Sequence, residues 1–124
     1  IQVGDQISTS GQLPLVSGSL PMTGLVGDQI SQGDAAGQAR VAALNALAAA
    51  ADVAGGVNNI RRVVRVVVYV ASTADFTAQP AVANGASELL GEIFGDAGRH
   101  IRSAIGVASL PLGAPVKVEL TVQV

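Results

Sequence analysis

An arginine among small residues near the end of the chain is the strongest candidate for chemistry in this sequence. The stretch "HIRSAIGV" alternates as a β-strand does, and residues two apart share a face. The even positions are His100, Arg102, Ala104 and Gly106. The odd positions, which have the apolar character of a core face, are Ile101, Ser103, Ile105 and Val107.

The small neighbours of Arg102 leave room for a ligand beside its guanidinium. Ala104 and Gly106 leave open space and bare backbone N–H groups on that side of the strand. The planar fork of an arginine can hold both oxygens of a carboxylate. The spacing therefore indicates a carboxylate receptor, and the simpler alternative is an arginine on a solvated face.

Other kinds of site find little support. His100 is the only histidine, cysteine is absent and the acidic residues are scattered, so we expect no metal site. A catalytic triad would have to use His100, and the sequence has no G-x-S-x-G, P-loop or dinucleotide-binding motif. Glu88 and Glu92 have the spacing of a solvated helix face.

The composition favours an oligomer that binds neither nucleic acid nor membrane. Hydrophobic residues make up 49% of the 124 residues and charged residues only 13%, which suits subunit interfaces that hide apolar surface. No apolar run is long enough for a membrane span, and the few basic residues do not cluster. The absence of cysteine fits a cytoplasmic protein. The chain begins at Ile1, and we expect N-terminal residues to be missing.

The hydrophobic pattern predicts an α+β domain. The expected elements are a hairpin in residues 1–13, a helix over 35–54 capped by Asp34, a buried strand over 60–71, a helix over 80–94 and strands over 100–108 and 116–124. The first helix should bury a stripe that includes Val41, Leu44 and Leu47. Two helices can cover only one face of such a sheet, so the other face should meet a second subunit.

Three segments of the chain resemble a known family. They are "TSGQLP" at Thr9–Pro14, "NGASELLGEIFG" at Asn84–Gly95 and "GRHIRSAIGVASLPLGAPVKVEL" at Gly98–Leu120. Together they are similar to the YjgF-type reactive intermediate deaminase (Rid) family, also called the endoribonuclease L-PSP family. The resemblance covers nearly the whole chain, and it implies one domain over residues 1–124 with a chorismate-mutase-like (ferredoxin-like) mixed sheet and two helices on one face.

The resemblance also implies a function. Such proteins are homotrimers with clefts between subunits, and they hydrolyse reactive enamines and imines to keto acids and ammonia without a metal or organic cofactor. Arg102 matches the arginine that grips the substrate carboxylate, and Ser10 matches a cleft serine. Gly11 and Ala104 match positions whose backbone N–H groups contact ligand, and Asn84 matches an asparagine near the cleft.

One position departs from the family pattern. Counting without gaps from Leu110-Pro111, the glutamate that positions the attacking water falls on Lys117, with Glu119 on the same strand face about 6.6 Å further along. A protonated lysine cannot accept a proton from water. Two hypotheses follow: an enamine/imine deaminase whose catalytic residue is unknown, and a non-catalytic metabolite-binding or regulatory trimer. The scarcity of basic residues disfavours a ribonuclease.

Overall fold

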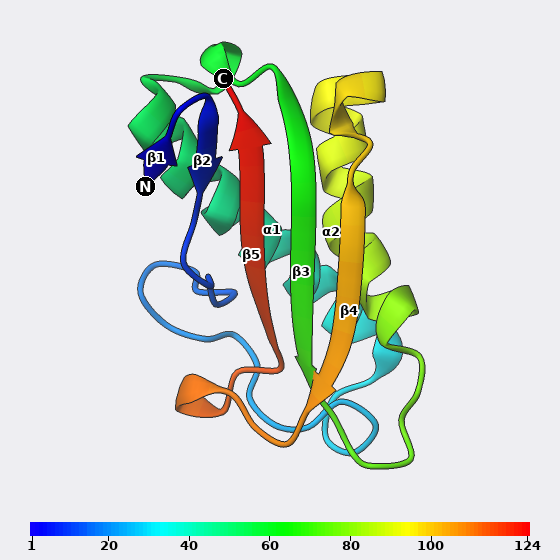
Figure 1. Ribbon diagram of the computed structural model, residues 1–124. Helices are drawn as coiled ribbons and strands as arrows, with labels where there is room; N and C mark the ends of the chain where they lie inside the picture. Colours follow the sequence, from blue (N-terminus) through cyan, green and yellow to red (C-terminus); the bar gives the residue numbers. More distant parts are fainter.

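The computed structural model describes residues 1–124 as a five-stranded mixed sheet with two long helices packed on one face (Figure 1). The elements are β1 (Gln2–Val3), β2 (Gln6–Ser8), α1 (Gln32–Ala54), β3 (Arg62–Ala71), α2 (Gln79–Phe94), β4 (Ile101–Val107) and β5 (Val116–Gln123). Single 3₁₀ turns occupy Val57–Asn59, Gly95–Gly98 and Pro111–Gly113. The strand order is β1-β2-β5-β3-β4, and β3 and β4 form the parallel pair. The predicted α+β class is confirmed.

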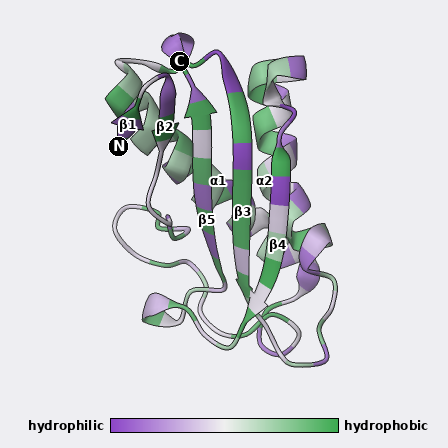
Figure 2. Ribbon diagram, in the orientation of Figure 1, coloured by the Kyte–Doolittle hydropathy of each residue, from purple (hydrophilic) through white to green (hydrophobic).

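Strict alternation in β5 defines the two faces of the sheet. Its residues Val116, Val118, Leu120 and Val122 are buried in the core on the side of the helices. Lys117, Glu119, Thr121 and Gln123 alternate with them and so lie on the opposite face, which no element of the chain covers (Figure 1). We call this opposite side the open face. β3 lies between β5 and β4 and is largely hydrophobic, as expected for a central strand (Figure 2).

The faces of β4 are the reverse of the sequence-based assignment. Arg102 pairs with Val66 and Ala104 pairs with Val68, and both valines are fully buried beneath the helices. The even residues of β4 therefore lie on the helix side, while Ile101 and Ile105 lie on the open face and are 63% and 43% exposed. The sequence-based assignment is wrong because Ile101 and Ile105, two apolar residues at alternate positions, have the spacing of a buried strand face although no element of this chain covers them.

The helix α1 begins and packs differently from the prediction. Ser31 is its N-cap and accepts a hydrogen bond from the backbone N–H of Asp34, so Asp34 is not the cap. Gly55 ends the helix in a left-handed conformation, as expected from its position. Leu47 is buried but Leu44 is 52% exposed, and the buried face is otherwise built mostly of alanines: Ala35, Ala39, Ala42, Ala43, Ala46 and Ala50.

Small residues on both helices allow a very close approach. The backbone of Gly85 in α2 lies against the backbone of Ala36 in α1, and a Cβ at Gly85 would overlap the Ala36 carbonyl oxygen. That oxygen belongs to the helix backbone and cannot move aside cheaply. The packing of α2 on α1, and with it the placement of α2 beside β4, therefore requires glycine at this position.

We expect Gly85→Ala to lower the free energy of unfolding by about 1–3 kcal/mol, the usual cost of overpacking. Gly91 in the same helix has open space where a Cβ would lie, so Gly91→Ala should raise stability by about 0.5–1 kcal/mol through its better helix propensity. Urea denaturation at matched protein concentration measures both changes. A Gly85→Ala protein as stable as wild type would contradict this helix packing.

Candidate functional site

Arg102 lies on the edge strand β4 and its guanidinium is held by α2. Its Nη1 donates a hydrogen bond to Asn84 Oδ1 at 2.8 Å and another to Ser87 Oγ at 3.2 Å. Asn84 and Ser87 are three residues apart and share one face of α2. Both acceptors are uncharged, and Nε and Nη2 of the exposed Arg102 form no hydrogen bond within the chain. The guanidinium is thus fixed at one nitrogen while its other N–H groups stay free.

Other arginines in the chain are used differently. Arg40 joins the two helices through an ion pair with Glu92, with 2.6 Å between Nη2 and Oε2. Arg99 lies 3.6 Å from Asp96, and Arg62 donates to backbone carbonyls. Arg102 is the arginine that neutral side chains hold in place without a carboxylate partner.

The backbone of β4 adds hydrogen-bond donors beside Arg102. The Ser72 N–H donates to the carbonyl of Val107, so Val107 directs its backbone groups toward β3. Because direction alternates along a strand, Ala104 and Gly106 direct theirs away from β3, to the outer edge of the sheet. The N–H of Ala104 therefore lies free on the same edge as the guanidinium.

The open space expected beside Arg102 is partly filled by α2. Ala104 packs against the hydrophobic core. A Cβ on Gly106 would lie 2.7 Å from Nε2 of Gln79, the first residue of α2. Small residues at these positions therefore let the helix approach the strand.

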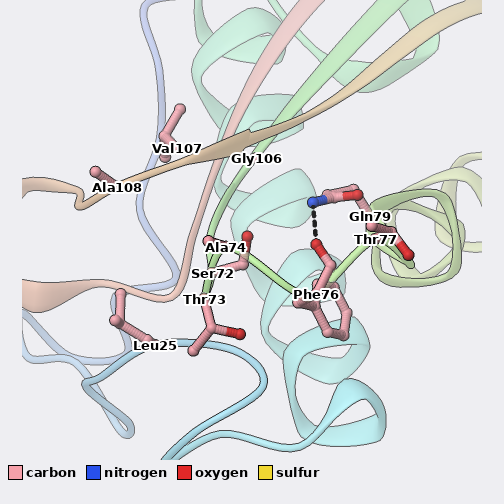
Figure 3. Close-up of a pocket in the computed structure, with 10 residues that line it drawn as sticks. All are labelled: Leu25, Ser72, Thr73, Ala74, Phe76, Thr77, Gln79, Gly106, Val107 and Ala108. Atoms are coloured by element: carbon pink, nitrogen blue, oxygen red, sulfur yellow. Dashed lines mark hydrogen bonds between the residues drawn. The ribbon is translucent and has the colours of Figure 1, made fainter.

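A hollow of about 620 Å³ lies beyond Gly106, at the carboxyl ends of the parallel strands β3 and β4 (Figure 3). This end of a parallel pair is a common location for ligands. Gln79 closes one side and donates from Nε2 to the carbonyl of Phe76 at 2.8 Å. Arg102 does not line the hollow, and neither does any charged residue: the lining is Leu25, Ser72, Thr73, Ala74, Phe76, Thr77, Gln79, Gly106, Val107 and Ala108.

Ser10 and Gly11 lie far from Arg102 within the chain. The next residue, Gln12, exchanges two backbone hydrogen bonds with Val118 of β5, at 2.8 and 2.9 Å. The segment therefore runs beside β5, about three strand spacings, or ~14 Å, from β4. Ser10 is exposed there. One chain alone does not bring these residues together with Arg102.

Lys117 and Glu119 also lie apart from Arg102, because they are on the open face and Arg102 is on the helix side. The aliphatic part of Lys117 crosses Gly11, where a Cβ would lie 2.6–2.8 Å from its carbons. Its Nζ lies 5.0 Å from the centre of the Tyr69 ring, within range of a cation–π contact. Glu119 is the carboxylate that β3, β4 and β5 present on the open face.

Tyr69 reports on the electrostatics of this face. Burial raises the pKa of its phenol, and the negative charge of Glu119 raises it further, while Arg65 acts in the opposite direction. The neutral phenol is therefore favoured over tyrosinate beside the Glu119 carboxylate.

We expect Tyr69 to ionise at a higher pH than a free tyrosine, and Glu119→Gln to lower its pKa by removing the neighbouring charge. Because Tyr69 is the only tyrosine and tryptophan is absent, tyrosinate absorbance during an alkaline titration reports on this residue alone. Glu88→Gln, on α2, is the control and should leave the titration unchanged. An unchanged titration in Glu119→Gln would show that the two side chains are not coupled.

Sequence reasoning misses Ser87, which contacts Arg102, and His100, which contacts Ser87. The sequence offers His100 only for a metal site or a triad, yet its Nε2 lies 2.9 Å from Ser87 Oγ. Two signals were available: Ser87 follows Asn84 by three residues on a helix, and His100 shares strand parity with Arg102.

Comparisons with known proteins agree with the fold and the sequence pattern. A family model described as "YjgF/chorismate_mutase-like, putative endoribonuclease" matches residues 1–124. Protein TCP17 of Trypanosoma cruzi is 40% identical over 121 residues, which are 97% of this chain and 76% of that protein.

Solved structures are similar over the same length. The crystal structure of Atu1372 from Agrobacterium tumefaciens, a protein of unknown function, has a TM-score of 0.97 and 39% identity, covering 100% of this chain and 80% of that chain. The YjgF gene product of Escherichia coli has a TM-score of 0.69 and 26% identity, covering 99% of this chain and 84% of that chain. Neither α1 nor α2 is both long and apolar enough to cross a membrane.

Proposed function

Because this chain belongs to the YjgF/chorismate mutase-like family, we propose that it is a cytoplasmic homotrimer that binds small carboxylates in clefts between subunits and hydrolyses reactive enamines and imines. The observation that carries the proposal is the state of Arg102. Its guanidinium is anchored on Asn84 and Ser87, has no carboxylate partner, and keeps free N–H groups at an exposed sheet edge. A free 2-imino or 2-keto acid supplies the carboxylate that such a group binds.

The separation of the candidate residues supports a cleft made by two subunits. Arg102 lies on the helix side of one sheet edge, whereas Glu119, Lys117 and the segment of Ser10 lie near β5. They can meet only if the β4 edge of one subunit approaches the β5 region of a neighbour. The open face has no cover in the single chain and exposes Ile101, which favours such an assembly.

In the proposed reaction, Arg102 holds the carboxylate and the N–H of Ala104 stabilises charge near the reacting carbon. The oxygen of water forms a bond to the imine carbon, and the C=N electron pair moves to nitrogen. Proton transfer from the new hydroxyl to nitrogen lets the C–N bond break, so that imino acid and water give keto acid and ammonia. Glu119 of the neighbouring subunit is our candidate acceptor for the water proton, since protonated Lys117 cannot accept it. Glu119 then passes this proton to the nitrogen that took the C=N electron pair, so both protons of water end on the ammonia and Glu119 is again a carboxylate.

The second candidate function is a binding protein without deaminase activity. The position of Lys117 favours it, because its side chain covers Gly11 and directs an ammonium, rather than a carboxylate, along the open face. Both functions need Arg102 for the carboxylate, and they differ in whether water is activated.

A coupled assay distinguishes the two functions. An amino-acid oxidase generates a short 2-imino acid, and semicarbazide traps what the protein has not hydrolysed. Wild type should speed the loss of imine. Arg102→Ala should lower kcat/KM about 10–100-fold, because a charge-assisted, two-bond contact is lost. Arg99→Ala is the matched control and should equal wild type, since the Arg99 side chain is largely exposed and its one ion-pair partner is Asp96.

Two outcomes would overturn parts of the proposal. If wild type equals buffer while keto acids still bind, the protein is a binding trimer. If Arg102→Ala retains full activity, Arg102 is not the carboxylate anchor.

Assembly has its own test. Size-exclusion chromatography with light scattering should give the mass of three chains, because the proposed assembly is a trimer and each of its clefts needs residues from two subunits. A monomer that still hydrolyses imines would contradict the inter-subunit site.

A further inference from the structure

A chain of hydrogen bonds runs from the guanidinium of Arg102 into the turn before β4. Arg102 Nη1 lies 3.2 Å from Ser87 Oγ, and Ser87 Oγ lies 2.9 Å from His100 Nε2. On the other side of the ring, His100 Nδ1 lies 2.6 Å from the carbonyl oxygen of Gly98. Four residues from α2, β4 and the turn between them are thus linked in a line.

When the His100 imidazole is neutral, the chemistry of the two ends fixes the direction of every bond in this line. A carbonyl only accepts, so His100 Nδ1 must carry the proton that it shares with Gly98. In the neutral ring Nε2 is then an acceptor, and the Ser87 hydroxyl donates to it. The Ser87 hydroxyl uses its one proton in the hydrogen bond to His100 Nε2. Its oxygen can then only accept from Arg102, whose N–H groups only donate.

The carbonyl of Gly98 is itself held firmly. A Cβ at Gly98 would lie 2.5 Å from the carbonyl oxygen of Leu90 in α2, so the absence of a side chain lets this backbone pack directly on the helix. Gly98 is buried. The line of hydrogen bonds therefore starts from packed backbone at Gly98 and ends at the guanidinium of a long side chain, Arg102.

We infer that Ser87 and His100 are positioning residues that hold the guanidinium of Arg102 ready for a carboxylate. Asn84 alone would fix one bond and leave the guanidinium free to turn about it. The second acceptor, Ser87, fixes the plane and directs the unused N–H groups outward, and His100 keeps the Ser87 hydroxyl in the accepting arrangement. The inference rests on the proposed carboxylate site and adds that its affinity depends on residues that do not touch the ligand.

The first test reads the proton directly. His100 is the only histidine, so a long-range ¹H–¹⁵N spectrum of wild type shows one imidazole. Near neutral pH we expect the tautomer with the proton on Nδ1, which is the less common one in water. Adding pyruvate should shift the Nε2 resonance through Ser87, and Arg102→Ala should abolish that shift. A proton on Nε2 of the neutral ring would overturn the inference.

The second test separates positioning from a merely structural role. His100→Leu and Ser87→Ala should each weaken pyruvate binding, and raise KM in the imine assay, about tenfold with kcat little changed. His100→Gln should restore most of the affinity, because its amide oxygen can accept from Ser87. Ser19→Ala is the control, since Ser19 lies in an exposed loop and its hydroxyl makes no contact with the site. Thermal unfolding of each variant checks that it is folded.

The outcomes distinguish failure of this inference from failure of the proposed function. If wild type neither binds pyruvate nor hydrolyses imines, the proposed carboxylate site fails and its positioning residues fail with it. If wild type binds pyruvate through Arg102 but His100→Leu binds equally well, only the positioning role is overturned. A His100→Gln protein as weak as His100→Leu would also contradict it.

Discussion

Coverage of only one face of the sheet is the constraint on which the rest of this structure depends. Two helices bury the valine and leucine side chains of β3 and β5 on one side, and no element covers the other. Because alternate residues of a strand point to opposite faces, this constraint decides where each chemical group lies. It places Arg102 with α2 and places Lys117 and Glu119 on the uncovered side.

The close packing of the helices extends the same constraint to the candidate site. Gly85 allows α2 to approach α1, and Gly106 allows Gln79 of α2 to approach β4. The face of α2 that carries Asn84 and Ser87 then lies above Arg102. A strand arginine that would otherwise be mobile is held at its guanidinium, while the adjacent backbone edge stays open. The close packing at Gly85 and Gly106 thus places α2 where it can orient the guanidinium of Arg102.

Much of the architecture could be predicted from the sequence because its signals are local. The alternation from Val116 onward, the proline at position 80 near the start of α2 and the glycine that ends α1 each act within a few residues. The faces of β4 could not be predicted, since Ile101 and Ile105 on the open face look like core residues. The buried alanines of α1 form no strongly apolar stripe, so spacing alone does not distinguish the exposed Leu44 from a core residue.

In the candidate site too, some features could be predicted from nearby residues and others depend on the tertiary structure. Residue type and strand parity identified Arg102, but its environment depends on the crossover from β3 through α2 to β4, which brings Asn84 and Ser87 to it from 18 and 15 residues away. A crystal structure of the protein grown with pyruvate tests the proposed site most directly. We expect both carboxylate oxygens to lie on the free N–H groups of Arg102, with the β5 region of a neighbouring subunit across the ligand. Pyruvate bound away from Arg102, or within a single subunit, would contradict that arrangement.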